Sequence, residues 1–438
     1  MKHQRWFTTL ALLGVLSLVA AACASDDDGG GGGGDGGVDC ATVEFGCAEV
    51  GADEPITLGS LLSISGDTAS LGTDSNHGIE LAIDDLDDTL DGTPGQLLDH
   101  DVELQQEDDL CSAEGGQAGG TALANDPKIV AVIGTSCSSS ALGVADKLLS
   151  DKGILLFSPS NTGPSLTAED QHQPFYARTA HNDKIQGAIV AEFVFNELGL
   201  DTAATINDES PYAAGLAEAF RTNFEAAGGT ITAVEQIDSG DQDFSALLRS
   251  IAEGNPGALY FPDFNPACAL ITKQAADIMP DAALLGSDGC LATEFFGTAG
   301  DAADGVYASS PDVTVFQGGD FYKNEFLPAY SEQFGTAPTS VFHAHAFDAT
   351  NIVFDAIEAV AIQNDDGSLS IPRQALRDAV FDTSGYQGIT GTITCTPTGD
   401  CATDVTIGIF QAPGWPVEGG DPNASAVYSD TKSLADVS

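Results

Sequence analysis

The sequence predicts an α/β protein with two lobes, each a mainly parallel sheet with helices on both faces. Short apolar runs rich in β-branched residues alternate with segments of helical periodicity from about residue 56 to residue 410. The roughly 380 residues that follow a glycine-rich N-terminal stretch are too many for one ordinary domain. Polar loops also follow two neighbouring strands, which is where open parallel sheets bind ligands.

The elements are expected in the following order. Strands are predicted at 56–63, 102–106, 129–133, 154–157, 175–179, 202–206, 231–236, 258–261, 282–285 and 305–309. Helices are predicted around 79–90 and 142–149, and at 111–125, 184–198, 211–227, 244–253, 266–278, 321–334, 342–362 and 373–380. Segments 391–394 and 405–410 flank Cys395 and Cys401, which indicates a hairpin closed by a disulfide.

The segment 128–167 is the most informative part of the chain. A buried strand at 129–133 leads into a serine-rich turn at 135–140, and a second buried strand at 154–157 leads into the polar loop 158–164. The first turn also begins a helix, so its free N–H groups and hydroxyls suit an anion. Ordinary N-capping explains one such turn equally well. Two turns on adjacent strands favour a site for a small carboxylate.

The N-terminus predicts export. Lys2 and Arg5 precede an apolar run at 6–22 that ends in three alanines, as a secretory signal does, and the run is short for a membrane span. Cys23 follows directly and resembles the lipid-modified cysteine of a bacterial lipobox. A plain signal peptide or an uncleaved anchor are the alternatives. The Asp- and Gly-rich stretch 26–37 argues against both, because it suits a tether between a lipid anchor and a folded body.

Domain boundaries follow from these assignments. Residues 1–22 form the signal peptide, and 23–55 the lipidated cysteine with its tether. Residues 56–178 and 311–386 form the first lobe, and 179–310 and 387–412 the second. Residues 413–438 are expected to be a polar tail.

Eight cysteines remain after Cys23, and an even number in an exported chain predicts disulfides. Pairing of sequence neighbours is expected. It joins Cys40 to Cys47, Cys111 to Cys137, Cys268 to Cys290 and Cys395 to Cys401. Zinc is the rival explanation, but no C-x-x-C pair occurs, and we expect no metal and no cofactor.

The charge is strongly negative, with 14 Lys and Arg against 66 Asp and Glu. A chain of this charge is a poor partner for nucleic acid or an anionic membrane surface. The acids are spread along the whole sequence, so a solvated acidic surface suited to saline surroundings is the simplest account. The hydrophobic fraction of 42% still supports a packed core.

The chain resembles the branched-chain amino-acid-binding proteins of bacterial ABC transporters, the leucine/isoleucine/valine-binding type. The most specific matches are Asp109-Leu110-Cys111, Cys137-Ser138-Ser139-Ser140 and the segment 153–159 (GILLFSP). The resemblance implies a type I periplasmic binding fold, in which three crossings join two lobes around a ligand cleft. It also implies a protein outside the cytoplasm that delivers its solute to a membrane permease. With the lipid anchor expected at Cys23, the protein is predicted to be a membrane-anchored monomer.

The resemblance also implies a set of ligand contacts. Ser138 would bind the α-carboxylate, and Ser160 and Thr162 the carboxylate and the α-ammonium. Asp288 stands where the family has an acid facing the ammonium, although an Asx-type turn aspartate before Gly289 is the plain alternative. The remaining positions are Tyr212 and Phe264, which could be core aromatics, and Leu71, where leucine-binding members carry an aromatic residue. Because of Leu71, short amides, urea and aromatic acids stay open as ligands.

Two other classes of function are an enzyme and a sensory ligand-binding protein. An enzyme needs a positioned nucleophile and base, yet no G-x-S-x-G elbow occurs. His343 and His345, two apart on a helix, point in different directions and cannot share a metal there. A sensory protein that reports to a membrane receptor would use the same ligand site, so only its membrane partner distinguishes it.

Overall fold

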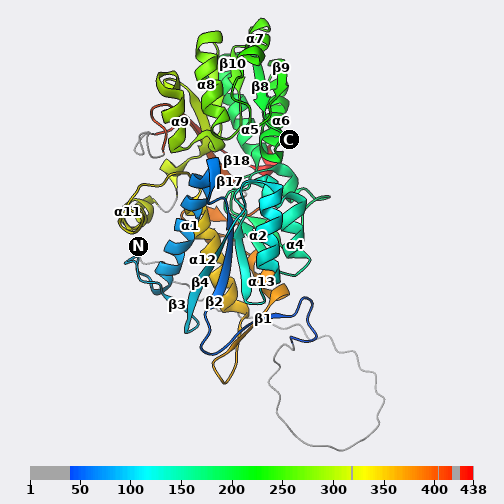
Figure 1. Ribbon diagram of the computed structural model, residues 1–438, viewed down its shortest axis with the longest axis vertical. Helices are drawn as coiled ribbons and strands as arrows, with labels where there is room; N and C mark the ends of the chain where they lie inside the picture. The colour runs from blue at the N-terminus through cyan, green and yellow to red at the C-terminus, as the bar shows by residue number, and fades with distance from the viewer. Residues whose placement is uncertain (1–39, 317–318, 403, 417–424, 438) are drawn as a thin grey trace, which may run out of the picture.

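The computed structural model describes residues 40–316, 319–402, 404–416 and 425–437. Figure 1 shows two lobes stacked along the long axis, each built on its own sheet with helices on both sides. This confirms the α/β class and the two-lobed arrangement predicted from the sequence. The predicted signal peptide, Cys23 and the glycine-rich stretch lie outside the described residues.

The first lobe contains a six-stranded sheet whose main strands are parallel, with one antiparallel strand at the edge. Its order is β3 (Gln96–Leu97), β4 (His100–Asp108), β2 (Ile56–Leu62), β5 (Ile129–Gly134), β6 (Leu155–Ser158) and β7 (Tyr176–Arg178). All residues of β2 and β5 are buried, as expected for central parallel strands covered on both faces.

Helices cover both faces of this sheet (Figure 1). One face carries α1 (Ala69–Asp84), α12 (His343–Val360) and α13 (Arg373–Phe381), with α10 (Gly319–Phe321) and α11 (Leu327–Phe334) outside them. The other carries α2 (Ala113–Asn125), α3 (Ser138–Ser140) and α4 (Asp146–Ser150). Two glycines let α1 approach its neighbours closely. A Cβ on Gly78 would lie 2.1 Å from a carbonyl oxygen of α12, and one on Gly72 would lie 2.0 Å from a carbonyl oxygen of the loop after β2.

The second lobe contains a seven-stranded sheet, parallel from β9 to β12 and antiparallel at its other edge. Its order is β18 (Tyr428–Ser433), β17 (Asp404–Gln411), β12 (Tyr307–Pro311), β11 (Ala283–Gly286), β10 (Ala258–Tyr260), β8 (Thr202–Asn207) and β9 (Thr230–Gln236). Helices α5 (Asp183–Glu192) and α6 (Pro211–Ala226) pack on one face. Helices α7 (Ser245–Glu253), α8 (Ala267–Ile278) and α9 (Thr293–Ala299) pack on the other.

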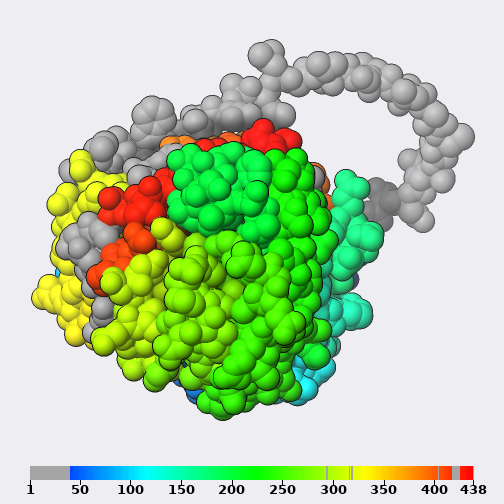
Figure 2. All heavy atoms as spheres, turned by 90° about the horizontal axis from the view of Figure 1, so that it is seen from above, coloured from blue at the N-terminus to red at the C-terminus, as the bar shows by residue number. Residues whose placement is uncertain are grey.

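Several local predictions were wrong. The expected tether contains β1 (Cys47–Val50), which pairs with β14 (Leu369–Pro372) because Ala48 and Val50 are buried. Strand β13 (Ile362–Gln363) completes that small sheet. The expected polar tail contains β18 at the edge of the second sheet, and Figure 2 shows this C-terminal segment, in red, at the surface beside α5.

The predicted hairpin around Cys395 and Cys401 does not form. Strand β16 (Thr392–Ile393) pairs with β15 (Tyr386–Gln387), whereas β17 pairs with β12 and β18. Most side chains of β17 are buried, so it takes an interior place in the sheet of the second lobe. The predicted helix over 142–149 is also interrupted, because Leu142 is non-helical and Gly143 has a left-handed φ of 69°.

Three crossings join the lobes, as the fold class requires. The first follows β7, the second follows β12, and the third precedes β17. Residues 389–390 are held to the first lobe, because the carboxylate of Asp348 on α12 accepts the N–H groups of Ile389 at 2.8 Å and Thr390 at 2.9 Å. The third crossing therefore lies after residue 393, later than the predicted boundary at 386.

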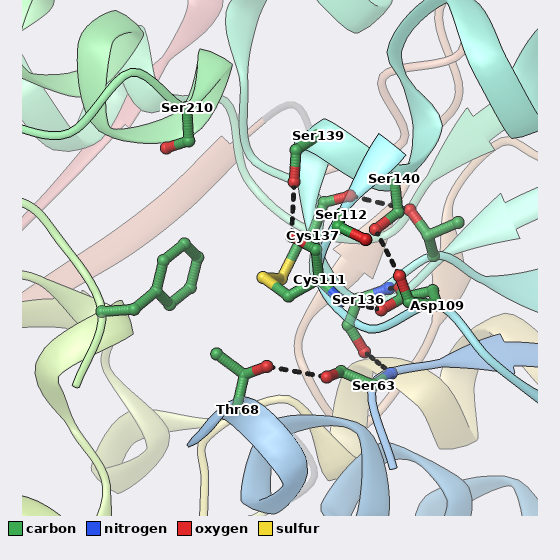
Figure 3. The surroundings of a disulfide bond; sticks show 12 residues. Ser63, Thr68, Asp109, Cys111, Ser112, Ser136, Cys137, Ser139, Ser140 and Ser210 are labelled. Carbon is green, nitrogen blue, oxygen red and sulfur yellow. Dashed lines mark hydrogen bonds between the residues drawn. A yellow bond between two sulfur atoms is a disulfide. The ribbon is translucent and has the colours of Figure 1, made fainter. Parts of the chain in front are cut away.

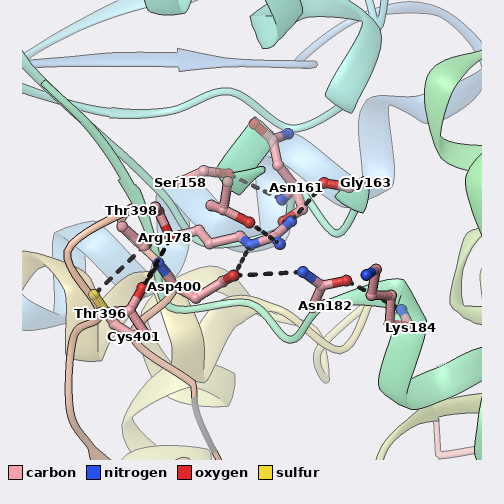
Figure 4. A network of polar contacts seen from close by, with 12 residues as sticks. Ser158, Asn161, Gly163, Arg178, Asn182, Lys184, Thr396, Thr398, Asp400 and Cys401 are labelled. Atoms are coloured by element: carbon pink, nitrogen blue, oxygen red, sulfur yellow. Dashed lines mark hydrogen bonds and ion pairs between the residues drawn. The ribbon is translucent and has the colours of Figure 1, made fainter. Parts of the chain in front are cut away.

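Arg178 ties the third crossing to the first (Figure 4). Its backbone N–H donates to the Gly399 carbonyl at 2.9 Å, and its carbonyl accepts the Cys401 N–H at 3.0 Å. Its guanidinium pairs with Asp400, with Nε 2.5 Å from Oδ1, and both side chains are buried. Burial disfavours the charged guanidinium, but Asp400 more than offsets this and raises the pKa of Arg178.

All four predicted disulfides are present. They join Cys40 to Cys47, Cys111 to Cys137, Cys268 to Cys290 and Cys395 to Cys401. Within the part of the chain that the structure describes, no helix has the length and apolar character that a membrane span requires.

Candidate functional site

The serine-rich turn after β5 is held in place from three directions (Figure 3). The buried Asp109 carboxylate accepts the N–H groups of Cys111 and Ser136, each at 2.7 Å. The Ser63 N–H donates to the Ser136 hydroxyl at 2.9 Å, and the Cys111–Cys137 disulfide closes the third side. Burial raises the pKa of Asp109 to about 7 even though these N–H groups lower it. The turn is therefore rigid before any ligand arrives.

The loop after β6 is bonded directly to this turn. The Ser160 hydroxyl donates to the Ser136 carbonyl at 2.9 Å, and the Ser138 hydroxyl accepts the Gly163 N–H at 3.1 Å. The sequence predicted that two polar strand exits would lie side by side in the first lobe, and the structure confirms it. Ser138 and Ser160 are almost completely buried.

The second lobe contributes a buried acid opposite these hydroxyls. Asp288 follows β11 at the start of a 3-10 turn. Its Oδ1 accepts two hydrogen bonds, one from Nε2 of Gln186 at 2.8 Å and one from the Tyr212 hydroxyl at 3.2 Å. Burial raises the pKa of Asp288 to about 6, against the effect of these hydrogen bonds. The Tyr212 hydroxyl also lies 2.6 Å from the Ser287 hydroxyl, and its ring packs on Phe264 with centroids 4.9 Å apart.

One cavity between the lobes is lined by six of the seven predicted ligand residues. They are Leu71, Ser138, Ser160, Tyr212, Phe264 and Asp288. Phe342 and Gly289 also line it and were missed. The sequence predicts Phe342 only as the first residue of a helix. The free volume of the cavity is about 20 Å³, which is roughly the room that one water molecule needs. The seventh residue, Thr162, is buried but does not line this cavity.

Two polar residues of α5 were also missed, Gln186 and Asp183. Gln186 joins Asp288 to the strand before the second crossing, since its Nε2 also lies 2.8 Å from the Ser309 hydroxyl. Asp183 is fully buried at the first position of α5. In the sequence, Asn182-Asp183 is an ordinary helix start. Only the burial of these side chains distinguishes them.

The histidines that were weighed as a catalytic or metal feature lie elsewhere. His343 Nδ1 is 2.8 Å from the Asp74 carboxylate and its Nε2 is 2.7 Å from the Tyr322 hydroxyl, inside the first lobe. His345 packs against Phe342 and Phe316. The two imidazoles therefore have separate surroundings, as their spacing on the helix predicted.

Comparison with known proteins supports the same conclusion. Residues 55–411 match the family described as periplasmic binding protein. The Leu/Ile/Val-binding protein BraC3 of Rhizobium johnstonii is 27% identical over 352 residues, covering 80% of this chain and 89% of that one. The leucine-, isoleucine-, valine-, threonine- and alanine-binding protein of Pseudomonas aeruginosa is 28% identical, covering 67% of this chain and 76% of that one.

Solved structures share the fold. The leucine-binding protein LivK of Thermotoga maritima superposes with a TM-score of 0.71 at 24% identity, covering 87% of this chain and all of that chain. A benzoate-bound solute-binding protein of R. palustris gives 0.69 at 20% identity, covering 87% of this chain and 96% of that one. The chain therefore belongs to the periplasmic binding proteins, which hold a solute outside the cytoplasm and are not enzymes.

Proposed function

We propose that this protein captures an amino acid with a branched aliphatic side chain in the cavity between its lobes and delivers it to an ABC permease. One observation carries the proposal: neutral hydroxyl and N–H groups of the first lobe face a buried carboxylate of the second. An α-amino acid needs donors at its carboxylate and an acceptor at its ammonium. The named ligands of the relatives agree with this choice.

Each end of the ligand has a partner of suitable chemistry. Ser138 would donate to the α-carboxylate, because its hydroxyl accepts the Gly163 N–H and keeps its own hydrogen for the ligand. Ser160 would join it only by giving up its hydrogen bond to the Ser136 carbonyl. Asp288 would accept the α-ammonium, which supplies the cation that a buried carboxylate needs. Leu71, Phe264 and Phe342 would surround the side chain with apolar surface. Thr162 remains a proposed ammonium partner that would need to turn toward the ligand.

Capture requires the lobes to separate. The cavity has room for about one water, far less than the volume of an amino acid. The crossings at 178–182, 311–316 and 394–402 would act as the hinge. Small-angle scattering should show a smaller radius of gyration with bound ligand, and an unchanged radius at saturation would contradict a closing clamp.

Membrane attachment is part of the proposal. Cys23 would carry lipid at the N-terminus of the mature protein, and the glycine-rich tether would let a monomeric binding body reach its permease. Mass spectrometry of the N-terminal peptide from a membrane fraction tests this. An unmodified Cys23 would refute the anchor and leave the ligand assignment untouched.

The ligand class is tested by a calorimetric cycle on Asp288. Asp288→Asn removes the charge and keeps the shape, so affinity for L-leucine should fall by about 2–5 kcal/mol, the cost of breaking a buried charged pair. That is at least roughly thirtyfold. The des-amino analogue 4-methylpentanoate should bind the variant as well as the wild type, or better.

The control variant is Asp146→Asn. Asp146 is another buried carboxyl whose pKa burial raises to about 6, but it does not line the cavity. It should leave both affinities unchanged. If Asp288→Asn weakens both ligands equally, Asp288 is a structural turn residue, and a plain carboxylate or amide becomes the better ligand.

A further inference from the structure

Asp183 is a second buried acid of the second lobe, and within the described part of the chain its carboxylate forms no ion pair. Its backbone N–H donates to the Thr162 carbonyl at 3.0 Å, which fixes the start of α5 against the ligand loop of the first lobe. Among the residues that the structure describes, neither carboxylate oxygen has a hydrogen-bond partner at normal geometry, and neither does the nearby Thr162 hydroxyl. All three oxygens are fully buried.

Asp183 and Asp288 both belong to the second lobe, Asp183 at the start of α5 and Asp288 just after β11. Gln186, one turn after Asp183 on α5, donates to Asp288 at 2.8 Å, so both acids lie against the same end of the helix. Burial raises the pKa of Asp183 well above its ordinary value, and the negative charge of Asp288 raises it further, against a smaller lowering by the nearby Thr162 hydroxyl. Two carboxylates in a dry site cannot both ionise cheaply without a cation.

The surrounding groups do not supply that cation. Arg178 lowers the pKa of Asp183 only weakly, because its guanidinium already pairs with Asp400. His181, whose Nε2 contacts Gln186, stays neutral because burial lowers its pKa to about 4.

The other titratable side chains near the two acids are either uncharged or exposed to solvent. Burial raises the pKa values of Tyr212 and Tyr260, so both phenols keep their protons. Lys184, the next residue on α5, is exposed to solvent. The two acids thus lack a positive partner in the described part of the site.

We propose that Asp183 and Asp288 form one acid pair within the second lobe, which holds a proton in the ligand-free protein and releases it when a ligand ammonium enters. This inference rests on the proposed function and adds the regulation of the same site. The ammonium arrives already charged, so no bond to nitrogen forms or breaks. The proton leaves a carboxyl oxygen for solvent, and the positive charge of the ligand takes its place.

The pair makes affinity depend on pH in one direction. At low pH the pair holds its proton and the ammonium must displace it, so binding is weaker. As pH rises from about 6 to 8, the ligand-free pair carries a proton less often, so the ammonium has less to displace and binds more tightly. The Kd should fall by up to about tenfold per pH unit. A site with Asp288 alone, once ionised, would show little change over this range.

Two measurements test the pair. The first is calorimetry of L-leucine in phosphate and Tris buffers at the same pH, which counts the protons released on binding. On binding at about pH 7 the wild type should release measurably more protons than Asp183→Asn does. Asp146→Asn should behave as the wild type. The wild type binding 4-methylpentanoate, which lacks the ammonium, should release none.

The second measurement needs no ligand. A carboxyl whose pKa is raised by folding costs stability as pH rises, so Asp183→Asn should melt progressively higher than the wild type from about pH 5 to 8. If the melting temperatures of the wild type and Asp183→Asn depend equally on pH, the proposal that the two acids share a proton is wrong, whichever ligand the protein binds. Leucine binding without proton release would also overturn it and leave the proposed function standing. Absence of binding by L-leucine, L-isoleucine and L-valine alike would instead refute the proposed function.

Discussion

Asp400→Asn should destabilise the protein although it changes only one atom. The Arg178 guanidinium is fully buried, and its other donors go to the carbonyls of Asn161 and Gly163 and to the Thr167 hydroxyl. Among the described residues, the Asp400 carboxylate is the one that forms an ion pair with it. Breaking a buried ion pair by removing one partner costs about 3–5 kcal/mol. The Asn oxygen can still accept the Nε hydrogen, so we expect about 3 kcal/mol.

The assay is urea unfolding at neutral pH, followed by circular dichroism. The matched control is Asp151→Asn, which breaks the pair between Lys147 and Asp151, whose side chains are 57% and 62% exposed. An exposed pair of this kind contributes less than about 1 kcal/mol. If Asp400→Asn also costs less than about 1 kcal/mol, Arg178 does not hold the crossings together, and the hinge described above is wrong.

Four further predictions concern stability. Replacing Cys111 and Cys137 by Ser should cost about 3–4 kcal/mol on loop-entropy grounds, measured by urea unfolding, and no loss would mean that the bridge does not form in the folded protein. Gly78→Ala should lower the melting temperature, at a cost of about 1–3 kcal/mol, because the new methyl group meets the backbone of α12. Gly297→Ala in α9 meets no atom within 4 Å and should stabilise by about 0.5–1 kcal/mol. Burial and then the charge of Asp208 raise the pKa of Asp263 to about 8, so the wild type should lose stability between about pH 4 and 8 relative to Asp263→Asn, and parallel melting curves would contradict this.

The sequence predicted the parts of the fold that local pattern determines. Strands β5 and β6 are short apolar runs with polar exits, and such runs are buried in parallel sheets wherever the chain takes them. The disulfides followed from pairing neighbours along the chain, because β4 and β5 end at the same edge of one sheet. The six cavity residues came from the family resemblance, and their role in binding stays a prediction.

The errors arise where long-range pairing decides the structure. Strand β18 is polar along its length and forms because β17 offers it an open edge, which no local pattern reveals. Residues 392–393 and 404–411 looked like two arms of one hairpin, yet they belong to different sheets. Asp183 was missed for a related reason, because its sequence neighbourhood is that of any helix start and its burial comes from the opposite lobe.

The central claim is that an amino acid binds between the lobes, and isothermal titration tests it most directly. The purified protein should bind at least one of L-leucine, L-isoleucine and L-valine saturably, with one ligand per chain. Ser138→Ala should weaken that binding without lowering the melting temperature of the ligand-free protein by more than a few degrees. Absence of saturable heat from all three amino acids with the folded wild type would contradict the claim.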